Sequence, residues 1–144
     1  MDLLSLLNEN ARLTNAQLAV MLGKTEEEVE KEIADYQQKG IIKGYKALIN
    51  WEKVDHHKTT ALIELKVQPK KESGFDEIAK KIMQFSKVES VYLMSGGFDL
   101  AVMVHGDSIQ DIAMFVAKRL SPLDSVLSTA THFILTRYKE GDVI

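Results

Sequence analysis

The 144-residue sequence contains no cysteine and only two prolines. The absence of cysteine excludes a disulfide framework, a thiolate nucleophile and a zinc site with cysteine ligands. The longest uninterrupted apolar run is the six residues 112–117, whereas a membrane-spanning helix needs roughly 20. The residues Met1-Asp2-Leu3 lack the positively charged segment of a secretory signal. We therefore expect a soluble, cytoplasmic protein with no membrane partner.

A positive charge excess, which is typical of nucleic-acid binders, is also missing. The chain has 18 basic and 21 acidic residues, a net charge of −3, and its first 50 residues are themselves slightly acidic. Any argument for DNA binding must therefore come from the pattern of residues rather than from composition.

Apolar residues at helical spacing predict three helices between residues 2 and 40. Thr14 with Gln17, and Thr25 with Glu28, have the spacing of capping boxes at the starts of the second and third helices. Gly40 follows the last helix, where glycine commonly ends one.

The spacing of Ala19, Gly23 and Val29 indicates a helix-turn-helix. Such a motif needs a small residue where its helices cross, a turn former between them, and an apolar residue that locks the second helix onto the first. The three residues fill these roles in that order. A generic three-helix bundle is the alternative.

The predicted third helix is acidic, although it occupies the place of a DNA-recognition helix. It contains one lysine and six acids: Lys31, Glu26, Glu27, Glu28, Glu30, Glu32 and Asp35. Acids in the first turn stabilise the helix dipole, and Lys31 is spaced to pair with Glu27 and Asp35. A glutamate can accept a hydrogen bond from cytosine, but phosphates repel it.

Five cations at helix ends and in the following connector are candidates for phosphate contacts. With four residues from the N-terminal part of the third helix, they make up the predicted DNA-binding set: Arg12, Lys24, Thr25, Glu26, Glu27, Lys31, Lys39, Lys43 and Lys46.

Residues 41–49 are predicted to form a strand that leads out of the helical domain, and the polar residues 50–58 a linker. His56 and His57 lie in this linker without a carboxylate or cysteine constellation. We therefore expect no metal site.

Beyond the linker, some segments have an apolar residue at every second position, as strands do, and others have apolar residues at helical spacing. The order of these segments predicts a β-α-β-β-α-β arrangement. Right-handed crossovers would interleave the halves into a four-stranded antiparallel sheet with both helices on one face. The open face is predicted to carry Leu62, Tyr92, Ala101, Met103, Thr129, Thr131 and Phe133. An open apolar face of this kind predicts self-association, most simply as a two-fold dimer.

Four stretches carry a resemblance across nearly the whole chain: ENARLTNAQLAVMLG (9–23), GIIKGYKALIN (40–50), VYLMSGGFDLAVMV (91–104) and LSTATHFIL (127–135). In this order they resemble the Lrp/AsnC (feast/famine) family of bacterial and archaeal transcription regulators. The resemblance implies an α+β protein. An N-terminal winged helix-turn-helix domain would span residues 1–49, a linker 50–58, and a ferredoxin-like βαββαβ (αβ-sandwich) effector and dimerisation domain 59–144. It also implies binding of double-stranded DNA, a homodimer that often assembles into octamers, and an amino-acid effector between subunits.

The turn between the second and third strands of that domain commonly reads Gly-Asp-aromatic-Asp in the family, and here it is Gly96-Gly97-Phe98-Asp99. The first acid, a candidate partner for an effector ammonium, is therefore missing. Threonines on the last strand match polar family positions that tend to face the effector. The implied effector set is Ser95, Gly96, Gly97, Phe98, Asp99, Thr129 and Thr131. Turn chemistry and strand propensity account for the same residues without a ligand.

Three functions remain open at this point: a DNA-binding regulator, an oligomeric small-molecule sensor with weak or lost DNA binding, and an enzyme. The sequence offers no convincing nucleophile–base pair, metal cluster or phosphate-binding glycine loop. His105 and His132 are single histidines within strands. We therefore expect no enzymatic activity, no cofactor and no metal.

Overall fold

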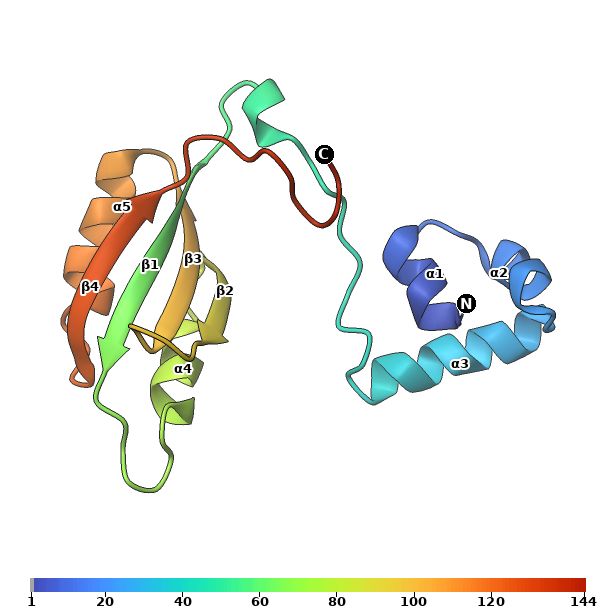
Figure 1. The fold of residues 1–144 in the computed structure, drawn as a ribbon, viewed down its shortest axis with the longest axis horizontal. Coiled ribbons are helices and arrows are strands. Elements are labelled where there is room, and N and C mark those ends of the chain that lie inside the picture. The colour runs from blue at the N-terminus through green and yellow to red at the C-terminus, as the bar shows by residue number, and fades with distance from the viewer. Residues whose placement is uncertain (1) are drawn as a thin grey trace. The chain divides into compact units, whose positions relative to one another are not determined.

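The computed structural model describes residues 2–144, which divide into two compact units (Figure 1). The first unit runs to Ala47, and the second spans Leu48–Ile144. Among the described residues, no helix is long and apolar enough to cross a membrane.

The first unit contains three helices, α1 (Leu3–Glu9), α2 (Asn15–Leu22) and α3 (Glu26–Gln38). Thr14 caps α2 with the predicted capping box: its hydroxyl accepts from the Gln17 backbone at 3.1 Å, and its own N–H donates to the Gln17 side chain at 2.9 Å. Thr25 caps α3 with only the first of these bonds, from the Glu28 N–H at 3.1 Å. The second predicted capping box is therefore half formed.

The turn between α2 and α3 confirms the helix-turn-helix prediction. Gly23 has φ 65°, a left-handed conformation that glycine adopts without a steric penalty. Ala19 and Val29 are both buried, on the facing sides of the two helices. The core of this unit consists of the buried residues Leu3, Leu6, Leu7, Leu18, Ala19 and Val29.

Residues 41–49 form no strand, so the prediction of a strand there was wrong. Gly40 ends the preceding helical segment with φ 73°, and the N–H groups of Ile41 and Ile42 both donate to the Tyr36 carbonyl. The chain that follows has no ladder of hydrogen bonds to another strand, and an extended segment without a pairing partner forms no β-strand.

The predicted linker residues 50–58 belong to the second unit, where Trp51–Lys53 form one 3₁₀ turn. Glu52 accepts a hydrogen bond from the backbone N–H of Arg137 at 3.2 Å.

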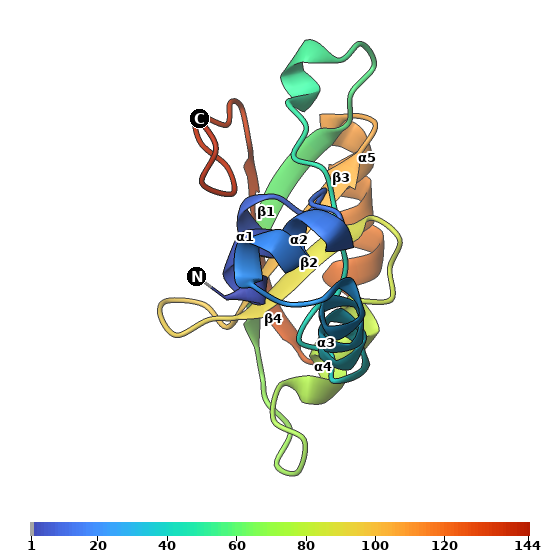
Figure 2. The same cartoon turned by 90° about the vertical axis from the view of Figure 1, so that its right-hand side faces the viewer.

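The second unit has the predicted antiparallel βαββαβ arrangement. Its sheet has the order β2-β3-β1-β4, and α4 and α5 lie on the same side of it (Figures 1 and 2). The elements are β1 (Thr59–Val67), α4 (Asp76–Ile82), β2 (Val88–Leu93), β3 (Leu100–Gly106), α5 (Ile109–Phe115) with a π-helical continuation (Val116–Leu120), and β4 (Val126–Phe133).

The buried side chains of β1 determine the two faces of the sheet. Ala61, Ile63 and Leu65 are fully buried in the core with the helices. Directly paired residues of neighbouring strands point to the same face. β3 contributes the buried residues Leu100, Val102 and Val104 opposite them. The helix-covered face therefore carries the alternating apolar residues of β1 and β3.

The open face is only partly as predicted. Leu62 pairs with Met103, and Glu64 pairs with Ala101, which in turn pairs with Tyr92. These residues lie on the open face, as expected, with Ala130 and His132 of β4 beside them.

The prediction for β4 itself was wrong by one residue. Thr129, Thr131 and Phe133 pair with Leu65, Ile63 and Ala61, so they lie on the helix-covered face. A shift of one residue exchanges the faces of a strand. The edge strand β4 has mixed polarity on both faces, so its sequence does not fix which face turns inward.

Asp99 ties the turn between β2 and β3 to the central strand. Its carboxylate Oδ2 accepts from the backbone N–H of Val67 at 2.8 Å, and its own N–H donates to the Leu65 carbonyl at 2.9 Å. Its carbonyl also accepts from the Met94 N–H at 2.8 Å. The side chain is therefore already engaged by the fold.

Replacing Asp99 with alanine should lower the free energy of unfolding of the second unit by about 1–3 kcal/mol, because the buried Val67 N–H loses its acceptor. Urea denaturation followed by the CD of the sheet measures the loss. Asp99→Asn retains an acceptor oxygen and should lose less. Equal midpoints for the wild type and Asp99→Ala would show that this bond contributes nothing.

Candidate functional site

The helix α3 has one packed side and one exposed ridge. Val29, Ile33 and Tyr36 face the core of the first unit. The opposite side, at spacings of three or four residues, carries the four exposed residues Glu27, Lys31, Ala34 and Gln38, which we call the outer ridge. The ridge carries one acid and one base, so it is close to neutral although the whole helix is acidic. Gln38 was not among the predicted DNA-binding residues, although its spacing of seven from Lys31 places it on this side.

Two ion pairs neutralise acids on the flank of α3. Lys24 Nζ lies 2.8 Å from Glu32 Oε2, and Lys39 Nζ lies 2.8 Å from Asp35 Oδ2. The hydrogen bond that Lys24 donates to Glu32 raises the pKa of Lys24, and the bond that Lys39 donates to Asp35 raises the pKa of Lys39. Two of the predicted phosphate-binding lysines therefore already have partners within the unit.

Lys31 does not form the pairs expected from its spacing. Within residues 2–144 it lies within ion-pair distance of neither Glu27 nor Asp35. Asp35 instead pairs with Lys39. Glu27 and Lys31 consequently leave their charged groups exposed on the outer ridge.

The remaining predicted DNA-binding residues lie around both ends of α3. Arg12 is exposed in the turn between α1 and α2, and Lys43 and Lys46 line an open groove between α1 and the connector. Among the described residues, these three cations form no ion pair. Thr25 uses its hydroxyl as the cap of α3, and Glu26 is exposed in the first turn.

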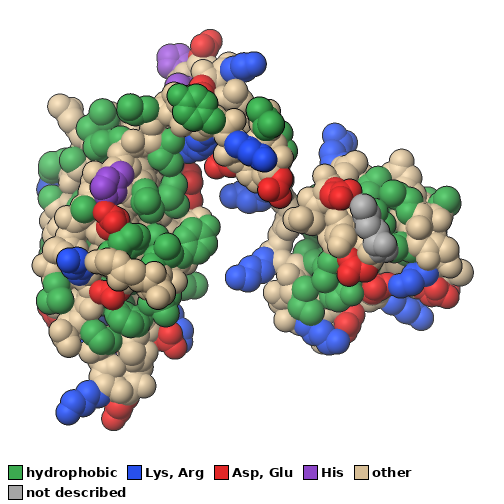
Figure 3. Space-filling view, in the orientation of Figure 1, with side chains coloured by type: hydrophobic (Ala, Val, Ile, Leu, Met, Phe, Trp, Pro, Cys, Tyr) green, Lys and Arg blue, Asp and Glu red, His purple; other side chains and the backbone are tan. Residues whose placement is uncertain are grey.

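Figure 3 shows acidic and basic side chains interspersed on the visible face of the helical unit rather than gathered into one basic patch. The electrostatic attraction of this unit for DNA therefore depends on a few positions and not on a broad positive field.

The predicted effector residues lie at one end of the sheet, on either side of β1. Ser95, Gly96 and Gly97 are exposed in the turn between β2 and β3, and Phe98 is half-buried. Leu65 of β1 binds Asp99 on one side and pairs with Thr129 on the other. Two strand spacings, about 10 Å, therefore separate the turn from β4.

The threonines differ in orientation from the turn residues. Thr129 and Thr131 are half-buried on the helix-covered face, whereas Gly96 and Gly97 lie exposed in the turn at the end of the sheet. The structure therefore brings these residues to one end of one sheet without gathering them around one point.

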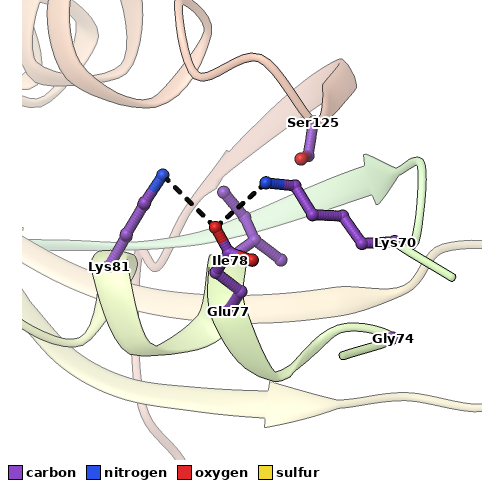
Figure 4. A pocket seen from close by; sticks show the side chains of 6 residues that line it. All are labelled: Lys70, Gly74, Glu77, Ile78, Lys81 and Ser125. Atoms are coloured by element: carbon purple, nitrogen blue, oxygen red, sulfur yellow. Dashed lines mark hydrogen bonds and ion pairs between the residues drawn. The ribbon is translucent and has the colours of Figure 1, made fainter. Parts of the chain in front are cut away.

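A polar cluster around α4 was not predicted from the sequence (Figure 4). Glu77 Oε1 binds Lys70 Nζ at 2.9 Å and lies 3.9 Å from Lys81 Nζ, near Ile78 and Ser125. The hydrogen bond from Lys70 lowers the pKa of Glu77. The cavity among these side chains, about 10 Å³, is water-sized and too small for an amino acid. Only the i,i+4 spacing of Glu77 and Lys81 was visible in the sequence.

Three of the four histidines contact a carboxylate or a backbone carbonyl. His105 Nδ1 lies 3.2 Å from Glu89, His132 Nε2 contacts Glu64 across the open face, and His57 Nδ1 lies 3.1 Å from the Val54 carbonyl. In the described part of the chain, no group of three or more His, Cys, Asp or Glu residues could hold a metal ion.

A family profile, the Lrp/AsnC ligand binding domain, matches residues 60–144. The uncharacterized HTH-type transcriptional regulator YugG of Bacillus subtilis is 48% identical over 139 residues, which cover 96% of this chain and 84% of that protein. The HTH-type transcriptional regulator LrpA of Pyrococcus abyssi is 28% identical over 137 residues, covering 95% and 94% of the two chains.

Solved structures share the fold. A Neisseria meningitidis transcriptional regulator in complex with L-Met aligns with a TM-score of 0.73 and 22% identity, covering 96% of this chain and 89% of that one. Escherichia coli AsnC aligns with a TM-score of 0.69 and 20% identity, covering 95% and 90%. With the helix-turn-helix and the βαββαβ sheet, the profile match and the YugG similarity show that this chain belongs to the Lrp/AsnC family of DNA-binding transcriptional regulators.

Proposed function

We propose that the protein binds double-stranded DNA as a homodimer, and that an amino acid bound between subunits alters this binding. The observation that carries the proposal is the 48% identity to a named HTH-type regulator, which extends over 96% of the chain and so includes the helical unit. The exposed outer ridge of α3 supports it, because a recognition helix needs a side free of packing to enter the major groove.

The DNA contacts divide into two groups in this proposal. Arg12, Lys43 and Lys46 contact phosphates, since they are exposed and unpaired among the described residues. Lys24 and Lys39 exchange their carboxylate partners for phosphates only at the cost of breaking ion pairs. The N-terminal part of α3, from its cap Thr25 through Glu26 and Glu27 to Lys31 in the second turn, faces the bases.

Replacing Lys43 with glutamate should weaken binding to all DNA sequences alike, by about tenfold at 50 mM salt, and should reduce the slope of log affinity against log salt by about 1. Fluorescence anisotropy with labelled DNA from the protein's own upstream region, titrated with salt, measures both. Lys71→Glu makes the same charge change at an exposed position of the second unit and should leave both unchanged. An unaltered slope in Lys43→Glu would remove this lysine from the interface.

The acidity of α3 favours one alternative, an oligomeric sensor whose DNA binding has been lost. This alternative predicts ligand binding and assembly without sequence-selective DNA binding at 50 mM salt, where cationic contacts are strongest. Selective binding to the upstream region would exclude it.

The open face of the sheet is the proposed dimer interface. Leu62, Met103 and Tyr92 give this face apolar area, and its one central acid, Glu64, has a hydrogen-bond partner in His132. A second copy related by a two-fold axis would cover the same face on both chains. Whether dimers assemble further into octamers is decided by the same mass measurement that tests the dimer.

Leu62→Glu should convert the protein to monomers, because a two-fold interface would bring two new carboxylates into an apolar contact. Sedimentation velocity over a range of concentrations measures the change. Met83→Glu adds the same charge at the end of α4, where the side chain is 57% exposed, and should leave the assembly intact. Wild-type sedimentation of Leu62→Glu would exclude this face as the interface.

The proposed effector is an amino acid near residues 95–99, with Thr129 and Thr131 contributing from β4. The Neisseria meningitidis neighbour was solved with L-Met, and an amino acid is the effector that the family resemblance implies. Because β1 separates the two groups of residues within one chain, a second subunit would be needed to enclose the ligand. The missing acid at Gly97 implies weak ligand binding.

Gly97→Asp should strengthen amino-acid binding roughly tenfold or more, because a carboxylate there would offer a charge-assisted hydrogen bond to the ammonium. An added Cβ at Gly97 meets no atom within 4 Å, so the change should not disturb the turn. Calorimetry with a panel of L-amino acids that includes L-Met gives the affinity. Gly44→Asp adds the same charge at an equally open glycine of the first unit. Identical affinities in the wild type and both variants would exclude the turn as the site.

A further inference from the structure

The outer ridge of α3 begins with an acid, which a protein that binds all DNA alike would not be expected to have there. Glu27 is the second residue of the helix and Lys31 the sixth, and Ala34 and Gln38 continue the same side. In a helix-turn-helix, the N-terminal residues of the second helix contact the base edges. A carboxylate is therefore the first large side chain of the ridge to meet the bases.

The charged groups of Glu27 and Lys31 are free for such contacts. Among residues 2–144, neither forms an ion pair or a side-chain hydrogen bond. The neighbouring acids Glu32 and Asp35 are held by lysines at 2.8 Å. The structure thus neutralises acids on the flank and leaves the acid on the ridge exposed.

The carboxylate of Glu27 and the ammonium of Lys31 form hydrogen bonds with different bases. A carboxylate only accepts hydrogen bonds, and in the major groove the cytosine amino group is its usual donor. A lysine ammonium only donates, and it binds the O6 and N7 acceptors of guanine. Both residues therefore favour G·C pairs, read from opposite strands or from neighbouring pairs.

The spacing of the two residues fixes how far apart these pairs can lie. Four residues of helix rise about 6 Å, and successive base pairs are about 3.4 Å apart. A helix that lies along the groove therefore places Glu27 and Lys31 within about two base-pair steps of each other.

We infer that Glu27 is a specificity-determining residue, which reads a cytosine in the major groove while Lys31 reads a guanine within two base-pair steps. The inference rests on the proposed DNA binding by α3. Glu27 also repels DNA that presents no amino donor at this position, because the carboxylate then faces acceptors and phosphates without compensation. The Glu27 carboxylate therefore lowers the affinity for DNA in general and increases the discrimination between sequences. This is specificity by repulsion of the wrong partner.

The inference is tested with the full-length wild type and the variants Glu27→Gln and Glu30→Gln. Each variant removes one negative charge from an exposed position of α3, but only Glu27 lies on the outer ridge. A preferred site is selected from random duplexes, and affinities are then measured for all single-base changes of that site. Helical CD confirms that the variants are folded.

Glu27→Gln should exchange the preference for cytosine at one position for adenine, since glutamine binds adenine N6 and N7 in two hydrogen bonds. The ratio of affinities for the two bases should change by roughly five- to 150-fold. Glu30→Gln should strengthen binding to every duplex by the same factor and leave the selected site unchanged. Lys31→Ala should lose a preference for guanine within two steps of the affected position.

Two results would overturn the inference while the proposed function stands: a Glu27→Gln protein that selects the wild-type site, or equal uniform gains from both glutamine variants. A wild-type protein that selects no sequence at any salt concentration would instead contradict the proposed DNA binding, and the reading of cytosine with it.

Discussion

The second unit depends on the two-sided pairing of β1. This strand is hydrogen-bonded to β3 on one side and β4 on the other, and its inward residues Ala61, Ile63 and Leu65 are fully buried. Strict alternation then directs Leu62 and Glu64 to the opposite face. Because α4 and α5 both cover the first face, the opposite face of the sheet carries no helix. The turn after β2 is joined to the same strand through Asp99.

In the first unit, the main constraint is the charge of α3. A helix that meets a polyanion should be basic, yet α3 holds six acids and one lysine. Lysines outside the helix compensate part of this charge at its two ends, through Glu32 and Asp35. The acids in the first turn also stabilise the helix dipole. What is left on the outer ridge is a small number of exposed polar groups, which suits discrimination between sequences better than tight general binding.

The sequence was sufficient for features that local chemistry determines. The capping box at Thr14, the left-handed Gly23 and the alternation along β1 follow from residue types at fixed spacings, and the family resemblance was confirmed by the profile match. The sequence was not sufficient where the structure of a segment depends on pairing with another segment. Residues 41–49 were predicted to be extended, but in the described part of the chain no neighbouring strand pairs with them.

The candidate site shows the same division. The face of β4 could not be deduced because Thr129 and Thr131 on one face are no more apolar than Ala130 and His132 on the other. Lys31 also lacks the partner that its spacing allowed, because Asp35 pairs with Lys39, which lies at the same i,i+4 spacing on the other side. Spacing indicates which side chains can meet, but competition between partners decides which ones do.

The ion pairs of Lys24 and Lys39 have a consequence for the cell. A lysine that leaves a carboxylate to join a phosphate frees one cation from the DNA, but the abandoned acid attracts another, so the net release is small. With three uncompensated cations per helical unit, doubling the ionic strength would weaken binding by about sixfold, against about twentyfold if all five were uncompensated. Occupancy of a promoter would then vary less during osmotic stress than the number of basic residues suggests.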